Sequence, residues 1–413
     1  MLFILIKNEF RKLIRRPKTW IVFALFAALI GLTMFGQYKS DENMRYYNSP
    51  EYQLENAKSN LEYYTSEIEK INAIEEDKKI GYEETLNNYL GEKVRLEESI
   101  KKYEDMIKKG DYSEAWKLEL DNEIKRQKED IKALEEEGIN EYNQNWYLDT
   151  KQKLEYNTYL KNNNIEPLYG WEFEAYAFMK TLIEILGMGI LVAGIAVFMS
   201  DIVSGECTPA TLKFLLVQPI KRGQVLLSKF IAVVTMVLVM ILGLELTGFG
   251  LVNVFSKIDG GSVPVIIGKI YESKINEQGY SEIIQKAGTG NMVSNNEMFI
   301  KALLLQALFI IATCAVVFLI SSVIKSSMIT MGVSVMVLVF ATILSLTLSS
   351  AQKVAHLLFV NYANTIALLT GLNVQMYNNV NMTVNTGIVV MLVTIIVSYV
   401  IAHVVFTKRD ILI

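Results

Sequence analysis

Polar and charged side chains inside apolar stretches are the first residues in this sequence that could do chemistry. Glu184 and Glu245 each lie within a long apolar run, and Lys180 precedes Glu184 by four residues, about one helical turn. A charge inside a bilayer is costly unless it is paired or hydrated, so such residues often mark a transport path. Gln306, in another apolar run, could join them. Two interpretations stay open: a polar patch that lines an export pathway, or a structural pair near the outer interface.

Patterns for catalysis and metal binding are not recognisable in the sequence. His356 and His403, the two histidines, are far apart and have no ligand-like neighbours, so we predict no metal site. The sequence contains neither a nucleophile–base pattern nor the phosphate-binding motif G-x-x-x-x-G-K-[ST]. We therefore expect a chain that is not an enzyme and holds no cofactor. Cys207 and Cys314 are expected to be free thiols.

The composition predicts a membrane protein. Apolar residues make up 51% of the 413 residues and charged residues 20%, which is more apolar than is usual for a soluble globular protein. A helix of about 20 apolar residues crosses a bilayer. Six runs reach roughly that length: residues 19–37, 176–199, 226–255, 299–323, 328–349 and 386–406. The sequence therefore predicts an all-α polytopic membrane protein with six transmembrane helices.

Lysine and arginine near the ends of these runs predict the orientation, because short cytoplasmic loops carry an excess of basic residues. With six crossings, every short basic cluster falls on one side of the membrane. These residues are Lys7, Arg11, Lys12, Arg15, Arg16, Lys18, Lys213, Lys221, Arg222, Lys229, Lys325, Lys408 and Arg409. We expect both termini to be cytoplasmic. The basic residues form no continuous stripe, so nucleic acid is not expected as a partner. Membrane lipids are expected as partners because of the apolar runs.

Residues 1–18 predict an amphipathic helix before the first run. Apolar residues recur at helical spacing, with basic residues opposite, at Ile6, Phe10, Leu13 and Ile14 against Lys7, Arg11, Lys12 and Arg15. Such a helix can lie in the inner interface as an elbow. The simpler interpretation is a positive anchor that only sets the topology.

The segment 38–175 predicts an acidic extracellular insert. It holds 20 Lys/Arg and 33 Asp/Glu, a net charge of −13 against +9 for the rest of the chain. Apolar residues step by three and four along it, as in a coiled coil. Ser49-Pro50 is a helix start, and Gly110 is predicted as the tip of an antiparallel hairpin with breaks at Gly81, Gly91 and Gly138. The insert is either a solvated spacer or a domain that contacts a substrate or partner.

Two further extracellular loops are predicted. Residues 256–298 are rich in glycine and indicate a small loop domain. In residues 350–385, the moderately apolar run 355–372 is interrupted by Asn361 and Asn364, so it could be re-entrant or interfacial. A seventh span there would place the final basic residues outside, against the charge rule.

The predicted cytoplasmic loop 200–225 contains a short apolar-faced helix. Thr208 can cap it with Pro209 at its first position, and Pro219 ends it. Its apolar face consists of Leu212, Leu215 and Leu216. Such a face needs a surface to bury against, either the membrane or a groove on a soluble partner.

The pattern of this loop is similar to the coupling-helix region of type-2 ATP-binding-cassette (ABC) exporter permeases. The matching residues are Glu206, Thr211, Leu212, Leu215, Leu216, Pro219, Ile220, Arg222 and Lys229, with Ala210 where glycine is expected. Residues 7–20 resemble the elbow helix of that family, and 406–410 resemble its cytoplasmic end. The large extracellular insert after the first span fits the same order of elements.

This resemblance implies the permease subunit of a bacterial exporter in the plasma membrane. It implies a dimer of permeases, either a homodimer or a heterodimer with a related chain, and two ABC ATPase subunits that bind ATP and Mg. Coupling to the ATPase would fall to Glu206, Thr208, Thr211, Leu212, Leu215, Leu216 and Arg222. The five-helix region 176–413 would carry the pathway, with Lys180, Glu184, Glu245 and Gln306 as candidate lining.

The substrate class stays open among hydrophobic drugs, antimicrobial or other peptides, lipids and ions. An alternative function is a membrane-anchored coiled-coil sensor or scaffold without transport. Long outer helices suit that alternative, but it leaves the apolar face of the cytoplasmic loop and the intramembrane carboxylates without a role.

Overall fold

Six long apolar helices dominate the fold. The structure, a computed structural model, describes residues 2–74, 82–110, 115–140, 142–206, 221–256, 258–275 and 281–408. Within these residues, six helical segments are long and apolar enough to cross a membrane. They are Pro17–Tyr47 (α2), Ala175–Met199 (α8, η2 and α9), Arg222–Phe255 (α11), Asn295–Val323 (α12), Ser327–Thr347 (α13) and Val384–Lys408 (α17). The predicted all-α polytopic membrane fold is confirmed.

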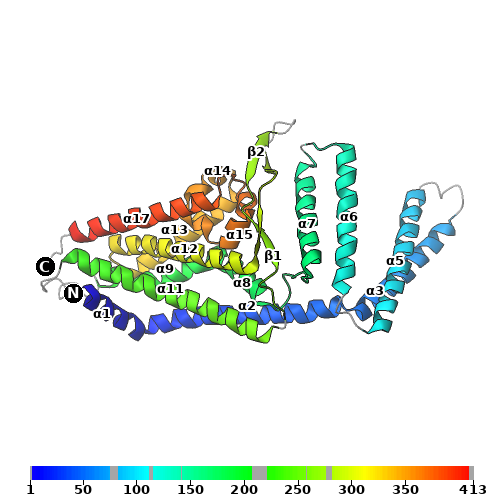
Figure 1. Cartoon of the computed structure of the whole chain (residues 1–413). Helices are drawn as coiled ribbons and strands as arrows, with labels where there is room; N and C mark the ends of the chain where they lie inside the picture. Colours follow the sequence, from blue (N-terminus) through cyan, green and yellow to red (C-terminus); the bar gives the residue numbers. More distant parts are fainter. Residues whose placement is uncertain are drawn as a thin grey trace. The chain divides into compact units, whose positions relative to one another are not determined.

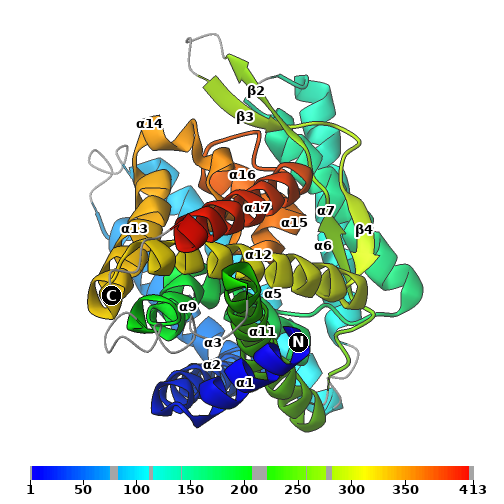
Figure 2. The same ribbon diagram turned by 90° about the vertical axis from the view of Figure 1, so that its left-hand side faces the viewer.

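The chain divides into two compact units. One consists of Met1–Phe35 and Arg126–Ile413, and the other of Gly36–Lys125. The first unit holds the bundle of spans. In it, α12 packs against α17, α11, α9 and α13, and Figure 2 looks along the bundle with α12 among these helices.

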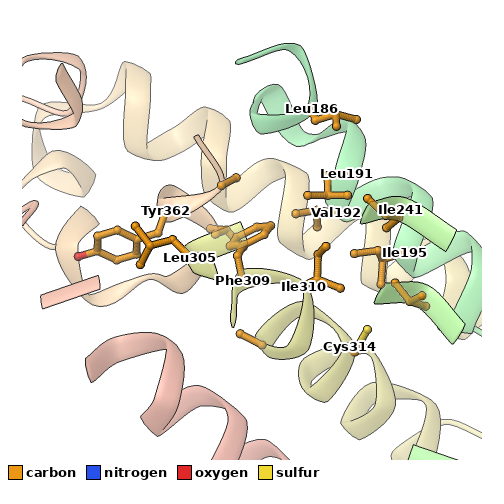
Figure 3. Packing of buried hydrophobic residues seen from close by; sticks show 14 of the residues in the cluster. Leu186, Leu191, Val192, Ile195, Ile241, Leu305, Phe309, Ile310, Cys314 and Tyr362 are labelled. Carbon is orange, nitrogen blue, oxygen red and sulfur yellow. The ribbon is translucent and has the colours of Figure 1, made fainter. Parts of the chain in front are cut away.

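The interior of the bundle is a close-packed apolar cluster. Figure 3 shows aliphatic side chains of three helices meeting there, with Ile195 from α9, Ile241 from α11 and Ile310 from α12. These three side chains are almost fully buried. This packing fixes how α9, α11 and α12 are rotated about their axes, and therefore where the polar groups that they carry lie.

The predicted second span is not one regular helix. It consists of α8 (Ala175–Ile185), the π turn η2 (Leu186–Ile190) and α9 (Leu191–Met199). Gly189 has φ 101° inside the turn, a left-handed conformation that favours glycine. A Cβ on Gly187 would lie 3.0 Å from the Cβ of Asn364. The two glycines therefore let the span bend where another segment packs against it.

The N-terminal helix α1 (Leu2–Arg15) confirms the predicted amphipathic helix, and it lies against α11. Pro17 occupies the first turn of α2, where its missing N–H costs nothing. The Thr19 hydroxyl donates to the Leu13 carbonyl at 2.6 Å, and the Trp20 indole N–H donates to the Ile14 carbonyl at 2.8 Å. These bonds hold the bend between α1 and α2.

The run 355–372 does not form a seventh span. Residues 349–376 fold into five short helices, namely α14 (Ser349–Gln352), η4 (Ala355–Leu357), η5 (Phe359–Tyr362), α15 (Thr365–Thr370) and α16 (Leu372–Met376). They pack among α8, α12, α13 and α17. Tyr362 is fully buried, its hydroxyl donates to the His356 carbonyl at 2.7 Å, and Figure 3 shows it beside Leu305 and Phe309.

The small loop domain predicted at 256–298 contains two antiparallel strand pairs. Strand β1 (Pro264–Ile267) pairs with β4 (Asn291–Ser294) in the register Pro264↔Ser294, and β2 (Tyr271–Ile275) pairs with β3 (Ser281–Gln285). Helix α7 (Gln144–Asn163) covers this domain. Its Gln152 amide donates to the Thr289 carbonyl at 3.0 Å. Together they form a folded cap at the end of the bundle that bears α15 (Figure 1).

The second unit contains a helical hairpin, but the predicted position of its tip was wrong. Helix α3 (Pro50–Asn72) pairs with α5 (Glu83–Lys109), so the two arms of the hairpin are the helices before and after residues 73–82, and Gly110 lies at the far end of the second arm. Lys58 lies 2.7 Å from Glu104, and the rings of Tyr64 and Tyr89 are 5.3 Å apart, as antiparallel pairing requires.

The predicted helix ends in this region have mixed outcomes. The Ser49 hydroxyl caps α3 by accepting from the Tyr52 N–H, as predicted. Gly110 ends α5 in a left-handed conformation, and Gly138 has φ 95° just after α6 (Ala115–Glu137). Gly91 was wrongly predicted as a break, since α5 continues through it, and Gly81 lies outside the described residues.

Candidate functional site

Two groups of polar residues carry the candidate function: one at the end of the bundle that holds the basic residues, and one inside the bundle. The first group surrounds the segment predicted to couple to an ATPase. That segment, 207–220, lies outside the described residues, and with it Thr208, Thr211, Leu212, Leu215 and Leu216. The described residues just before and after this segment show how the chain on either side of it is bonded to the helices of the bundle.

Asp201 anchors the chain before this segment. Its carboxylate accepts a charge-assisted bond from Arg16 and lies 3.0 Å from the Lys18 ammonium. Burial alone would raise the pKa of Asp201, but the two basic neighbours outweigh burial and hold that pKa below its usual value. The Lys18 ammonium also donates to the Ser200 hydroxyl at 2.9 Å. The end of α9 is therefore tied to the start of α2.

Ser321, near the end of α12, holds the same turn from the other side. Its hydroxyl oxygen accepts from the backbone N–H groups of Val203 and Ser204, each at 3.2 Å, and it donates to the Ser200 carbonyl at 3.1 Å. These groups are fully buried. The turn that leads into η3 (Ser204–Glu206) is thus fixed to α12 as well as to α2.

Lys229 anchors the chain after the segment. It lies two turns into α11, its side chain is 2% exposed, and its ammonium lies 3.1 Å from the Glu9 carboxylate of α1. Glu9 also pairs with Lys12 at 3.1 Å. Burial opposes the charge on Glu9, but these two lysines outweigh it and lower its pKa. The Lys229 pair therefore ties α1 to α11, after the segment 207–220. The Asp201 bonds tie the start of α2 to the chain before that segment.

Two of the predicted coupling residues fall within the described part of the chain. Glu206 is the last residue of η3, and Arg222 is the first residue of α11. The Arg222 guanidinium donates to the Thr407 carbonyl of α17 at 3.5 Å. Arg222 thereby links the start of α11 to the end of α17.

The second group separates into two sites that the sequence had placed together. Glu245 of α11 and Gln306 of α12 are fully buried, and the Gln306 amide donates to Glu245 Oε1 at 2.8 Å. Lys180 and Glu184 lie on the exposed side of α8, one turn apart. Within the single chain, Glu245 and Gln306 bridge two helices, whereas Lys180 and Glu184 face outward. The lining of one path by all four residues stays a prediction.

Sequence reasoning missed the anchoring residues Glu9, Asp201 and Ser321. Arg16, Lys18 and Lys229 had been noted for their charge or their place in a pattern, without partners. A carboxylate at the inner end of a span, surrounded in sequence by basic clusters, is the signal that could have singled out Asp201. Its partners lie 183 and 185 residues away along the chain, so only the fold could identify them.

Comparison with known families gives a match over almost the whole chain. Residues 3–411 match the family described as ABC-2 family transporter protein. A comparison with curated proteins found no match. The six apolar helices long enough to span a membrane agree with the family match. The chain belongs to the ABC-2 transporter family and is a membrane-spanning permease of that family.

Proposed function

We propose that this chain is the permease subunit of an exporter that is driven by ATP hydrolysed on a separate subunit. The observation that carries this proposal is the anchoring of the chain on both sides of the segment 207–220. Asp201 before it and Lys229 after it are paired with the first two helices. Because of these pairs, a movement of a bound ATPase against this segment would be transmitted to α1, α2, α9 and α11 together.

The chain itself has a non-catalytic role in this proposal. ATP and Mg bind to two ABC ATPase subunits, and two permease chains, identical or related, surround the path. Residues 207–216 dock on the ATPase through the face that Leu212, Leu215 and Leu216 form, and Glu206 and Arg222 flank that face. The basic end of the bundle, with both termini, faces the cytoplasm of a bacterial cell.

Tilting of the anchored helices would open the path alternately to the two sides. The exposed face of α8, with Lys180 and Glu184, is the part of this chain proposed to meet the path or the second permease. The substrate is proposed to be a hydrophobic or peptide-like compound, such as a drug or an antimicrobial peptide, or an ion.

Co-purification with the ATPase subunit tests the coupling role. We expect Leu212→Ala with Leu215→Ala to weaken ATPase binding at least tenfold. A buried leucine contributes roughly 1.5–3 kcal/mol by transfer, and about 1.4 kcal/mol is one decade of affinity. The matched control is Leu348→Ala with Leu357→Ala, which changes two exposed leucines at the other end of the bundle. Wild-type ATPase binding and transport by the first variant would refute the docking role.

Glu206→Gln separates coupling from assembly. We expect this variant to retain the ATPase while its ATP hydrolysis responds less to transported compound. Transport of a defined compound by wild-type permease and ATPase in vesicles, lost without ATP, would also exclude a scaffold that does not transport.

A further inference from the structure

A groove lies between α11 and α17 at the end of the bundle that carries the basic residues. Its volume is about 630 Å³, within the range of about 300–1,000 Å³ that is typical of small-molecule sites. Figure 1 shows the C-terminal end of α17 close to the N-terminal end of α11 at this end of the bundle, and the two helices are in contact. The groove is lined by Lys221, Gly223, Gln224, Leu227, Tyr399, Val400, His403 and Val404.

One side of the groove is apolar and open to the surroundings of the bundle. Val400 and Val404 are 52% and 43% exposed, and both lie on the face of α17 that turns away from α12. The Tyr399 ring packs against Phe230 of α11 with centroids 5.0 Å apart. An apolar chain that lies along these side chains would run parallel to the spans, as the acyl chains of a bilayer do.

The other end of the groove is positively charged. Lys221 directly precedes α11, a helix of 34 residues whose N-terminal dipole favours an anion. The bond from Arg222 to the Thr407 carbonyl brings that guanidinium to the end of α17, next to Lys408. Lys221 therefore lines the groove where its apolar lining ends, and Arg222 and Lys408 are its basic neighbours at the ends of the two helices.

Gly223 and His403 shape the polar end of the groove. A Cβ on Gly223 would lie 2.6 Å from His403 Cε1, so glycine is needed for the imidazole to pack there. His403 Nδ1 is buried and makes no hydrogen bond within the described part of the chain.

We propose that this groove binds one anionic phospholipid, with its headgroup at Lys221 and one acyl chain along Leu227, Val400 and Val404. The shape and the charge argue together for this ligand. Basic pockets between transmembrane helices bind anionic headgroups, and each basic residue near such a surface contributes roughly 1 kcal/mol. A neutral drug would gain nothing from the positive charge of Lys221. A second protein chain would need to bring both an anion and an apolar segment. The inference requires only that this end of the bundle lies at a membrane interface, not that the chain exports a substrate.

Native mass spectrometry of the full-length permease, titrated with phosphatidylglycerol or phosphatidylcholine, tests the proposal. We expect phosphatidylglycerol to bind at least fivefold more tightly, and Lys221→Gln to reduce that preference about fivefold, the factor that corresponds to about 1 kcal/mol. Lys325→Gln is the matched control, because Lys325 is an exposed lysine at the same end but outside the groove. Lys221 is exposed as well, so its loss should not prevent folding.

A second pair of variants tests where the acyl chain lies. Val404→Trp fills the groove without changing its charge and should lower phosphatidylglycerol binding, whereas Val393→Trp, on an exposed part of α17 outside the groove, should not. A phosphatidylglycerol with a photoreactive acyl chain should label residues 397–404. Equal retention of the two lipids, equal effects of Lys221→Gln and Lys325→Gln, or labelling elsewhere would each overturn the proposal. Loss of transport with lipid binding intact would instead count against the exporter alone.

Discussion

The buried bond between Glu245 and Gln306 allows a test of the two interpretations of the polar groups in the spans. Both side chains are fully buried, and the 2.8 Å bond joins α11 to α12. Glu245 Oε2 and Gln306 Oε1 have no hydrogen-bond partner within the described residues. If the pair is structural, Gln306→Leu leaves a buried carboxyl group without its partner, and the bundle should lose stability.

The expected loss can be bounded from both sides. Leaving a buried polar group unsatisfied costs about 1–3 kcal/mol. Bonds between helices in membrane proteins average only about 0.6 kcal/mol in double-mutant cycles, with a maximum of about 1.7. We therefore expect Gln306→Leu to lower the free energy of unfolding by about 1–2 kcal/mol. Glu245→Gln, which can keep the bond, should change it by less than about 0.5 kcal/mol.

Unfolding in a series of denaturing detergent mixtures measures these changes. The double variant Glu245→Leu with Gln306→Leu is the matched control, because it removes both polar groups. It should regain most of the lost stability, since replacing both partners with apolar groups is often close to neutral. In each variant, transport per folded molecule should stay near the wild-type value. Unchanged unfolding together with a large loss of transport in Glu245→Gln would refute the structural role and restore the pathway interpretation.

Three further predictions concern the rest of the chain. Gly260→Ala should destabilise the cap by about 1–3 kcal/mol, measured as a lower melting temperature, because its Cβ would lie 2.5 Å from the buried Glu174 carboxyl group. Asp201→Asn should lower the free energy of unfolding at neutral pH by about 1–2 kcal/mol, since the ion pair with Arg16 is only about a quarter exposed. Because the pKa of Asp201 is lowered in the folded protein, wild type should lose this stabilisation as pH falls through that pKa, and the variant should not. A membrane-impermeant thiol reagent should modify Gly110→Cys in intact cells, but not Lys325→Cys, if the basic end is cytoplasmic.

Controls for these predictions come from the same chain. Gly250→Ala has no atom within 4 Å of the added Cβ and should leave the melting temperature near wild type. An Asp201→Asn protein whose unfolding follows the wild-type pH dependence would contradict the role of the anchor. Labelling of Lys325→Cys from outside, with Gly110→Cys protected, would reverse the proposed topology.

The sequence by itself determined the number of spans, their order and the amphipathic first helix. These follow from local rules, because a bilayer requires about 20 apolar residues in helical form and a helix repeats every 3.6 residues. The cap of α3 at Ser49 and the end of α5 at Gly110 are equally local, since each depends on a hydroxyl group or a left-handed glycine within a few residues.

Tertiary structure decided which groups are partners. The sequence placed the hairpin tip at Gly110, because the same helical period runs through both arms and does not say where the chain reverses. The sequence grouped Lys180 and Glu184 with Glu245 only by their predicted depth in the membrane. The rotation of each helix about its axis places Lys180 and Glu184 on the exposed surface of the bundle and Glu245 in its interior. The pairing of Asp201 with Arg16 joins residues 185 positions apart. Local pattern carries no information at that range, so only the packing of the bundle could bring these charges together.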